Sequence, residues 1–236
     1  MDKSMWATAL AICTVAAACA GHPAPQATSA PPSPAAPIAA SALPGLLLNT
    51  EQVNTTMGAT GMTVEDGKNY TQMSTAEGIP AECAGVAIPA AAPAYAGSGW
   101  TGYQGQVLFE PGDQLAHYVD QDVVAFPTAG HATAFYKQAG ALWRGCSNRS
   151  YTARPPDPGK NGTWDVGPVK DSDGMLTAIR QSERHVGWRC QRALTVANNV
   201  VIDVMACAYG NANTLGVTLA KQLAAKAAPG SGNPGK

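Results

Sequence analysis

The sequence has 236 residues and a formal net charge of −1 at pH 7. Basic and acidic residues nearly balance, and the basic residues form no patch. This argues against a nucleic-acid-binding protein and against a protein held to lipid by charge alone. Beyond the N-terminal segment, no stretch is long and apolar enough to span a bilayer.

The N-terminus has the pattern of an exported lipoprotein. Met5 to Val15 is apolar and uncharged, and it is too short for the ~20 residues of a spanning helix. Three alanines then precede Cys19, which resembles the lipobox cut by lipoprotein signal peptidase, although Ala16 stands where the usual pattern has Leu. We expect residues 1–18 to be a signal peptide and Cys19 to carry a lipid. The alternative is ordinary signal cleavage without a lipid.

A spacer follows the cysteine. Residues 22–44 contain seven prolines and no Lys, Arg, Asp or Glu, so they lack the side chains to bury a core. We expect residues 19–42 to form an extended, partly polyproline tether. The folded domain is expected over residues 43–228, a length that suits one domain. Residues 229–236 are rich in Gly and Pro and are expected to form a tail.

Periodicity and turn residues predict alternating groups of helices and strands in that domain. The neighbouring strands are joined by short turns, which favours an antiparallel sheet. We therefore expect an α+β fold with about six strands, packed helices and a groove. In chain order, we first expect a helix that ends at residue 57 and begins with a capping box at Asn49 and Gln52, then a short helix around Cys83 and strands over 99–109 and 116–126. A helix from Thr128 to Cys146 follows, with Phe135, Ala139, Leu142 and Trp143 on its apolar stripe. The remaining expected elements are strands over 163–169, 175–183, 188–197 and 200–209 and a helix over 211–228.

Four cysteines lie in the expected domain, and an even number in an exported protein predicts disulfides. The Asn-Asn pair at 198–199 can form a two-residue hairpin turn. That turn places Cys190 directly opposite Cys207, with about 4.5 Å between Cα atoms, which suits a disulfide. Cys83 then pairs with Cys146 by elimination. A zinc site is the alternative, disfavoured because no CxxC pair exists and the spacings are wide.

None of the four histidines lies in a nucleophile or metal motif. We therefore expect no enzyme activity, no metal and no cofactor. Asp120 and Asp122 share one face of a predicted strand while His117 points the other way. We interpret the two aspartates as part of a solvated edge, in preference to a metal site.

Asp203 is the unusual polar residue of the last strand, because its neighbours are apolar. In the predicted hairpin it shares a face with Arg192, which lies diagonally across and within reach. Two interpretations remain open. The pair supports the fold from inside, or its two side chains line a polar cleft.

Four segments resemble the PknH-like extracellular sensor domain family: LLLNTEQVNTTMGATGM, the Cys83 segment, TAFYKQAGALWRGC and GWRCQRALTVANNVVIDVMACAYG. The resemblance spans roughly residues 43–226. It implies an antiparallel sheet with flanking helices, disulfides that pair the first cysteine with the second and the third with the fourth, and a ligand-binding groove. Members form the outer part of mycobacterial receptor kinases or occur on exported lipoproteins.

These observations favour a lipoprotein on the extracytoplasmic face of the cell membrane, with a non-catalytic, sensor-like domain that binds an unknown envelope ligand. The membrane is reached through the lipid alone. The second hypothesis is a protein-interaction or scaffolding lipoprotein, and the third is a hydrolase with an unrecognised site. A deep pocket would favour a small ligand, and a flat apolar patch would favour a protein.

Overall fold

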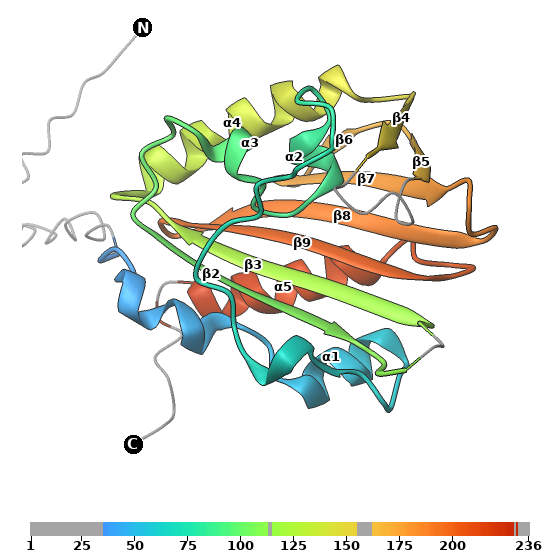
Figure 1. The fold of residues 1–236 in the computed structure, drawn as a ribbon. Helices are drawn as coiled ribbons and strands as arrows, with labels where there is room; N and C mark the ends of the chain where they lie inside the picture. The colour runs from blue at the N-terminus through green and yellow to red at the C-terminus, as the bar shows by residue number, and fades with distance from the viewer. Residues whose placement is uncertain (1–34, 113–114, 155–161, 229, 231–236) are drawn as a thin grey trace, which may run out of the picture. The chain divides into compact units, whose positions relative to one another are not determined.

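The computed structural model describes residues 35–112, 115–154, 162–228 and 230. Within these residues the chain forms a nine-stranded antiparallel sheet with helices on both faces (Figure 1). The strand order is β1-β2-β3-β9-β8-β7-β5-β4, and β6 pairs with β7. This confirms the expected α+β fold. The elements are η1 (Ala40–Leu46), α1 (Thr50–Met57), β1 (Thr63–Val64), η2 (Glu65–Gly67), α2 (Ala84–Ala87), α3 (Ala92–Tyr95), β2 (Gly102–Phe109), β3 (His117–Ala125), α4 (Ala129–Gly145), β4 (Arg149–Ala153), β5 (Gly162–Val166), β6 (Lys170–Ser172), β7 (Met175–Ser182), β8 (Trp188–Ala197), β9 (Val200–Tyr209) and α5 (Leu215–Ala227).

The sequence predicts about six of these strands and misses the three short ones, β1, β4 and β6. These strands have between two and five residues, so alternation along each is too brief to stand out. The turn between β6 and β7 has positive φ at Asp173 and Gly174, as a tight hairpin turn requires.

The β8–β9 hairpin has the predicted register, from Ala197 opposite Val200 to Trp188 opposite Tyr209. Its turn residue Asn199 also anchors the start of the domain. The Asn199 side-chain oxygen accepts the Ile38 N–H at 2.7 Å. The folded part therefore begins before the predicted boundary at residue 43, because the hairpin turn provides hydrogen-bond partners for the preceding backbone.

One face of the sheet packs against α5, α1 and η1 (Figure 1). Leu219 and Leu223 of α5 are fully buried there, against strand residues such as Ile202. The α1 helix begins with the predicted capping box, in which the Asn49 side chain and the Gln52 side chain each bond the other residue's backbone N–H.

The opposite face carries α2, α3 and α4 (Figure 1). The α4 helix buries Phe135, Ala139 and Trp143 as predicted, but Leu142 is 40% exposed. Leu142 lies about 100° around the helix from Trp143, so it points away from the sheet. The apolar stripe of α4 is therefore narrower than the sequence predicts, because Leu142 is not part of it.

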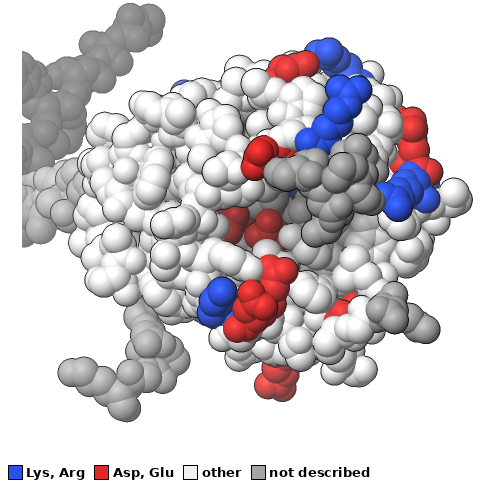
Figure 2. Space-filling view, viewed as in Figure 1, with Lys and Arg blue, Asp and Glu red and all other residues white. Residues whose placement is uncertain are grey.

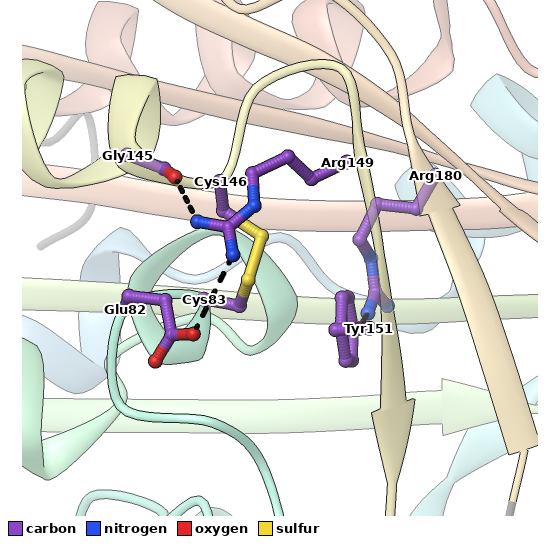
Figure 3. Close-up of a disulfide and its surroundings, with 7 residues drawn as sticks. All are labelled: Glu82, Cys83, Gly145, Cys146, Arg149, Tyr151 and Arg180. Atoms are coloured by element: carbon purple, nitrogen blue, oxygen red, sulfur yellow. Dashed lines mark hydrogen bonds and ion pairs between the residues drawn. A yellow bond between two sulfur atoms is a disulfide. The ribbon is translucent and has the colours of Figure 1, made fainter.

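Both expected disulfides are present in the fold. Cys83 at the start of α2 is joined to Cys146 at the end of α4, and Cys190 is joined to Cys207 across β8 and β9. Arg149 links the two chain segments that carry the first disulfide. Its guanidinium donates to the Gly145 carbonyl and lies 3.9 Å from a Glu82 carboxylate oxygen (Figure 3).

Candidate functional site

The sheet face under α2, α3 and α4 changes from apolar to polar along its strands. Val124 of β3 and Val201 of β9 pack beneath the helices. Further along, the same face carries Asp120, Asp122, Arg180, Arg192 and Asp203, which we call the polar face. Figure 2 shows a hollow in the surface with acidic side chains at its bottom.

Arg192 and Asp203 form an ion pair inside the polar face. The Arg192 Nη2 lies 2.5 Å from Asp203 Oδ1 and also donates to the Gly85 carbonyl at 3.1 Å. Asp203 Oδ2 accepts from the Ala90 N–H at 3.0 Å and the Tyr95 hydroxyl at 3.1 Å. The exposed fractions are 0% for Arg192 and 1% for Asp203. The interpretation that this pair lines an open cleft is wrong, because α2 and α3 cover it.

The pair therefore attaches the segment from α2 to α3 to the sheet. Burial raises the pKa of Asp203, while Arg192, the Ala90 N–H and the Tyr95 hydroxyl all lower it. Ala90 has a φ of 40°, in the left-handed region that costs an alanine about 1–2 kcal/mol. The hydrogen bond from the Ala90 N–H to the Asp203 carboxylate offsets that strain, because charge-assisted hydrogen bonds are stronger than those between neutral groups.

Asp122 lies directly opposite Asp203 on the next strand. Its exposed fraction is 2%, and its Oδ1 accepts the Tyr103 hydroxyl at 3.0 Å. Gly105 lies across from Asp122 on β2, and a Cβ there would overlap both the Tyr103 hydroxyl and Asp122 Oδ1. The missing side chain of Gly105 thus makes room for this hydrogen bond.

Asp120 and Asp122 do not lie on a solvated edge, because β3 is an interior strand between β2 and β9. Among the described residues, neither forms an ion pair with a basic side chain. Burial raises the pKa of Asp120 to about 7. Burial and the neighbouring carboxyls raise the pKa of Asp122 well above its ordinary value. Burial of these two carboxyl groups therefore favours their protonated forms.

Arg180 of β7 is a buried cation that the sequence analysis missed. Its exposed fraction is 5%, and its guanidinium lies 4.6 Å above the Trp164 ring. It donates to the Tyr151 hydroxyl, toward which it points in Figure 3, and its Nη2 lies 2.8 Å from Met205 Sδ. Within the described part of the chain, Nε has no acceptor and the guanidinium has no carboxylate partner.

A signal for Arg180 does exist in the sequence. The alternation of β7 places it on the same face as Leu176 and Ala178, both of which are buried. A long cation in the apolar register of a strand indicates a buried charge. Its proximity to Met205 could not be predicted, since that depends on the order of β7, β8 and β9 in the sheet.

A second concavity lies on the opposite face, between α5 and strands β6, β7 and β8. It has a volume of about 650 Å³ and is lined by polar and apolar side chains, among them Lys170, Thr177, Gln191, Val217 and Lys221. The Gln191 amide bridges β8 and α5, because its oxygen accepts the Val217 N–H at 3.0 Å and its nitrogen donates to the Asn213 carbonyl.

The described ranges contain no group of three His, Cys, Asp or Glu side chains placed to hold a metal ion. In the same ranges, no helix has the length and apolar character to cross a membrane. Cys19, the expected lipid-bearing residue, lies outside the described residues.

Comparison with known proteins gives a consistent set of relatives. Residues 38–226 match the family model described as the PknH-like extracellular domain. Serine/threonine-protein kinase PknH of Mycobacterium tuberculosis and that of Mycobacterium bovis are 40% identical over 194 residues, which is 81% of this chain. The match covers 30–32% of those kinases, so the chain spans about a third of the length of the curated relatives it matches.

A solved structure agrees with the sequence relatives. The crystal structure of the extracellular domain of PknH from Mycobacterium tuberculosis superposes with a TM-score of 0.75 at 37% identity. The superposition covers 81% of this chain and 97% of that domain.

Proposed function

Because the chain belongs to the PknH-like extracellular domain family, we propose that it acts outside the cytoplasm as a sensor-like domain that binds a ligand and catalyses no reaction. The match covers the extracellular part of the kinase relatives, and the solved neighbour is that extracellular part alone. Binding would then be the chain's own contribution, and the response would depend on another protein.

The charge arrangement of the polar face is the observation that carries this proposal. Asp120 and Arg180 have no ion-pair partner among the residues that the structure describes. A buried or half-buried charge without a partner lowers stability. A ligand that supplies the opposite charge binds the folded state preferentially and raises stability by mass action. The hollow in Figure 2 gives such a ligand access to the acidic side chains.

Thermal unfolding tests ligand binding directly. The full chain is heated with fractions of cell-envelope metabolites and glycans, alongside the variants Asp120→Asn and Asp165→Asn. Asp165 is an exposed aspartate of β5 and serves as the matched control. We expect one fraction to raise the Tm of the wild type and of Asp165→Asn but not of Asp120→Asn. If no fraction shifts the wild type, or if all three proteins shift equally, the proposal is wrong.

The anchor is a separate part of the proposal. The apolar segment, the three alanines before Cys19 and the proline-rich run after it support export and lipidation. We expect a lipid precursor to label the wild type and the Cys13→Ala variant but not Cys19→Ala, which should leave the membrane fraction. Label that survives Cys19→Ala would contradict the anchor without affecting the ligand-binding part.

An alternative function, protein interaction, is supported by a different surface. Val186, Tyr209 and Leu115 are 88%, 53% and 42% exposed. They lie near the same end of the sheet, where His117 of β3 pairs with Ala208 of β9. Crosslinking in cells from a photoreactive residue at position 186 would trap a defined partner if this surface docks a protein. A uniform background of products would count against it.

A further inference from the structure

Two charges of opposite sign flank one methionine on the polar face. Asp120 of β3 is the direct cross-strand partner of Met205 of β9. Arg180 reaches over from β7, and its Nη2 lies 2.8 Å from Met205 Sδ. Asp120 and Arg180 lie on strands that are separated by β9 and β8, and the two side chains form no ion pair with each other. The polar face thus carries an acidic and a basic side chain on either side of Met205, with no ion pair between them.

The cationic side of this arrangement points to an acidic ligand group. Arg180 is 95% buried, given its exposed fraction of 5%. A tyrosine hydroxyl and a methionine sulfur accept from it, and Nε finds no acceptor among the described residues. Neither acceptor carries a charge, and the thioether sulfur of methionine is a weak hydrogen-bond acceptor. The planar guanidinium is suited to a carboxylate or phosphate, which it binds through two parallel hydrogen bonds.

The anionic side points to an ammonium group. Asp120 is half-buried, and Asp122 lies on the same face of β3. Tyr118 lies on the other side of Asp120 along that face, and aromatic rings attract ammonium cations. The pKa of Asp120, raised to about 7 by burial, means that a bound ammonium would take the place of a proton.

We propose that the hollow of the polar face binds a small zwitterion, with the ammonium group at Asp120 and the acidic group at Arg180. This inference rests on the proposed ligand-binding function and names the chemistry of that ligand. Free amino acids and amine-containing phospholipid headgroups share this chemistry. Glycine and phosphoethanolamine represent the two sources.

Isothermal titration of the full chain tests the inference with matched fragments. Phosphoethanolamine is compared with ethanolamine and with inorganic phosphate, and glycine with methylamine and with acetate. We expect at least one zwitterion to bind at least tenfold more tightly than either of its fragments. The zwitterion with the larger ratio identifies the source. Equal affinity for the zwitterion and its amine fragment would overturn the assignment of Arg180.

Variants locate the binding site. We expect Asp120→Asn and Arg180→Gln each to weaken the zwitterion at least tenfold, whereas the exposed controls Asp165→Asn and Arg149→Gln leave it unchanged. Arg180→Gln changes a buried residue and can fail to fold. Asp120→Asn removes a half-buried charge at constant volume, so its result decides the matter alone. Unchanged affinity in a folded Asp120→Asn protein would overturn the inference.

The two proposals fail in different ways. If an envelope fraction stabilises the wild type but no zwitterion outperforms its fragments, ligand binding stands and the zwitterion assignment is wrong. If neither fractions nor zwitterions have any effect, both are wrong.

Discussion

Asp203→Asn is the most informative single change in the core. It removes the charge that faces Arg192 while nearly preserving the side-chain volume. The guanidinium then stays at 0% exposure without a counter-charge, and breaking a buried pair in this way costs about 3–5 kcal/mol. Asp122 lies opposite, and burial and the neighbouring carboxyls raise its pKa well above the ordinary value, which favours its uncharged form. Removing the charge of Asp203 therefore relieves little repulsion from Asp122, so this relief recovers little of the lost stability.

Urea unfolding and thermal unfolding of the full chain with its disulfides intact measure this loss as a free energy and as a Tm. For a domain of this size, 1 kcal/mol lowers the Tm by about 2–4 °C, so the Tm should fall by about 6–20 °C. The double variant Arg192→Met/Asp203→Leu should recover much of the loss, because it leaves no buried charge unpaired. Asp165→Asn serves as the surface control. A stability of Asp203→Asn within about 0.5 kcal/mol of the wild type would refute the reasoning, since that is the range of neutral surface changes.

Two further predictions concern the neighbouring carboxyls. An aspartate has a pKa of about 3.9 in the unfolded chain. The folded state raises this value to about 7 for Asp120 and well above the ordinary value for Asp122, so it holds both protons more tightly. The free energy of unfolding therefore falls as pH rises above about 4, and the contribution of Asp120 is lost by about pH 7. Urea midpoints from pH 4 to pH 8 should show this decline in the wild type and a flatter profile in Asp122→Asn; identical profiles would exclude these carboxyls as the cause. Gly105→Ala should lower the free energy of unfolding by about 1–3 kcal/mol through overpacking, because its Cβ overlaps the Tyr103 hydroxyl and Asp122 Oδ1. Gly61→Ala, whose Cβ would approach no atom closer than 3.9 Å, is the control, and an equal change in both variants would contradict this account.

Local features of the fold could be predicted from the sequence. The turn at 198–199 determines the register of β8 and β9, and that register places Cys190 opposite Cys207. The capping box of Asn49 and Gln52 is contained within four residues. Such features depend on neighbours in the chain, so residue types and spacing suffice to identify them.

The polar face could be predicted only in part, because it depends on strand order. Asp122 and Asp203 are 81 positions apart in the chain and lie opposite each other only because β3 pairs with β9. Without that pairing, β3 could equally be an edge strand, and its aspartates would then be solvated. Likewise, Arg192 and Asp203 share a face as predicted, but their burial depends on α2 and α3, which come from a distant segment of the chain.

Hydrogen–deuterium exchange tests the central claim, that the polar face is the ligand-binding surface. The full chain is compared with and without the envelope fraction that gives the largest thermal shift. We expect added protection in β3, over His117–Ala125, and in the segment from α2 to α3 that adjoins the polar face. Protection confined to α5 and β6, which border the groove on the opposite face, would contradict the account.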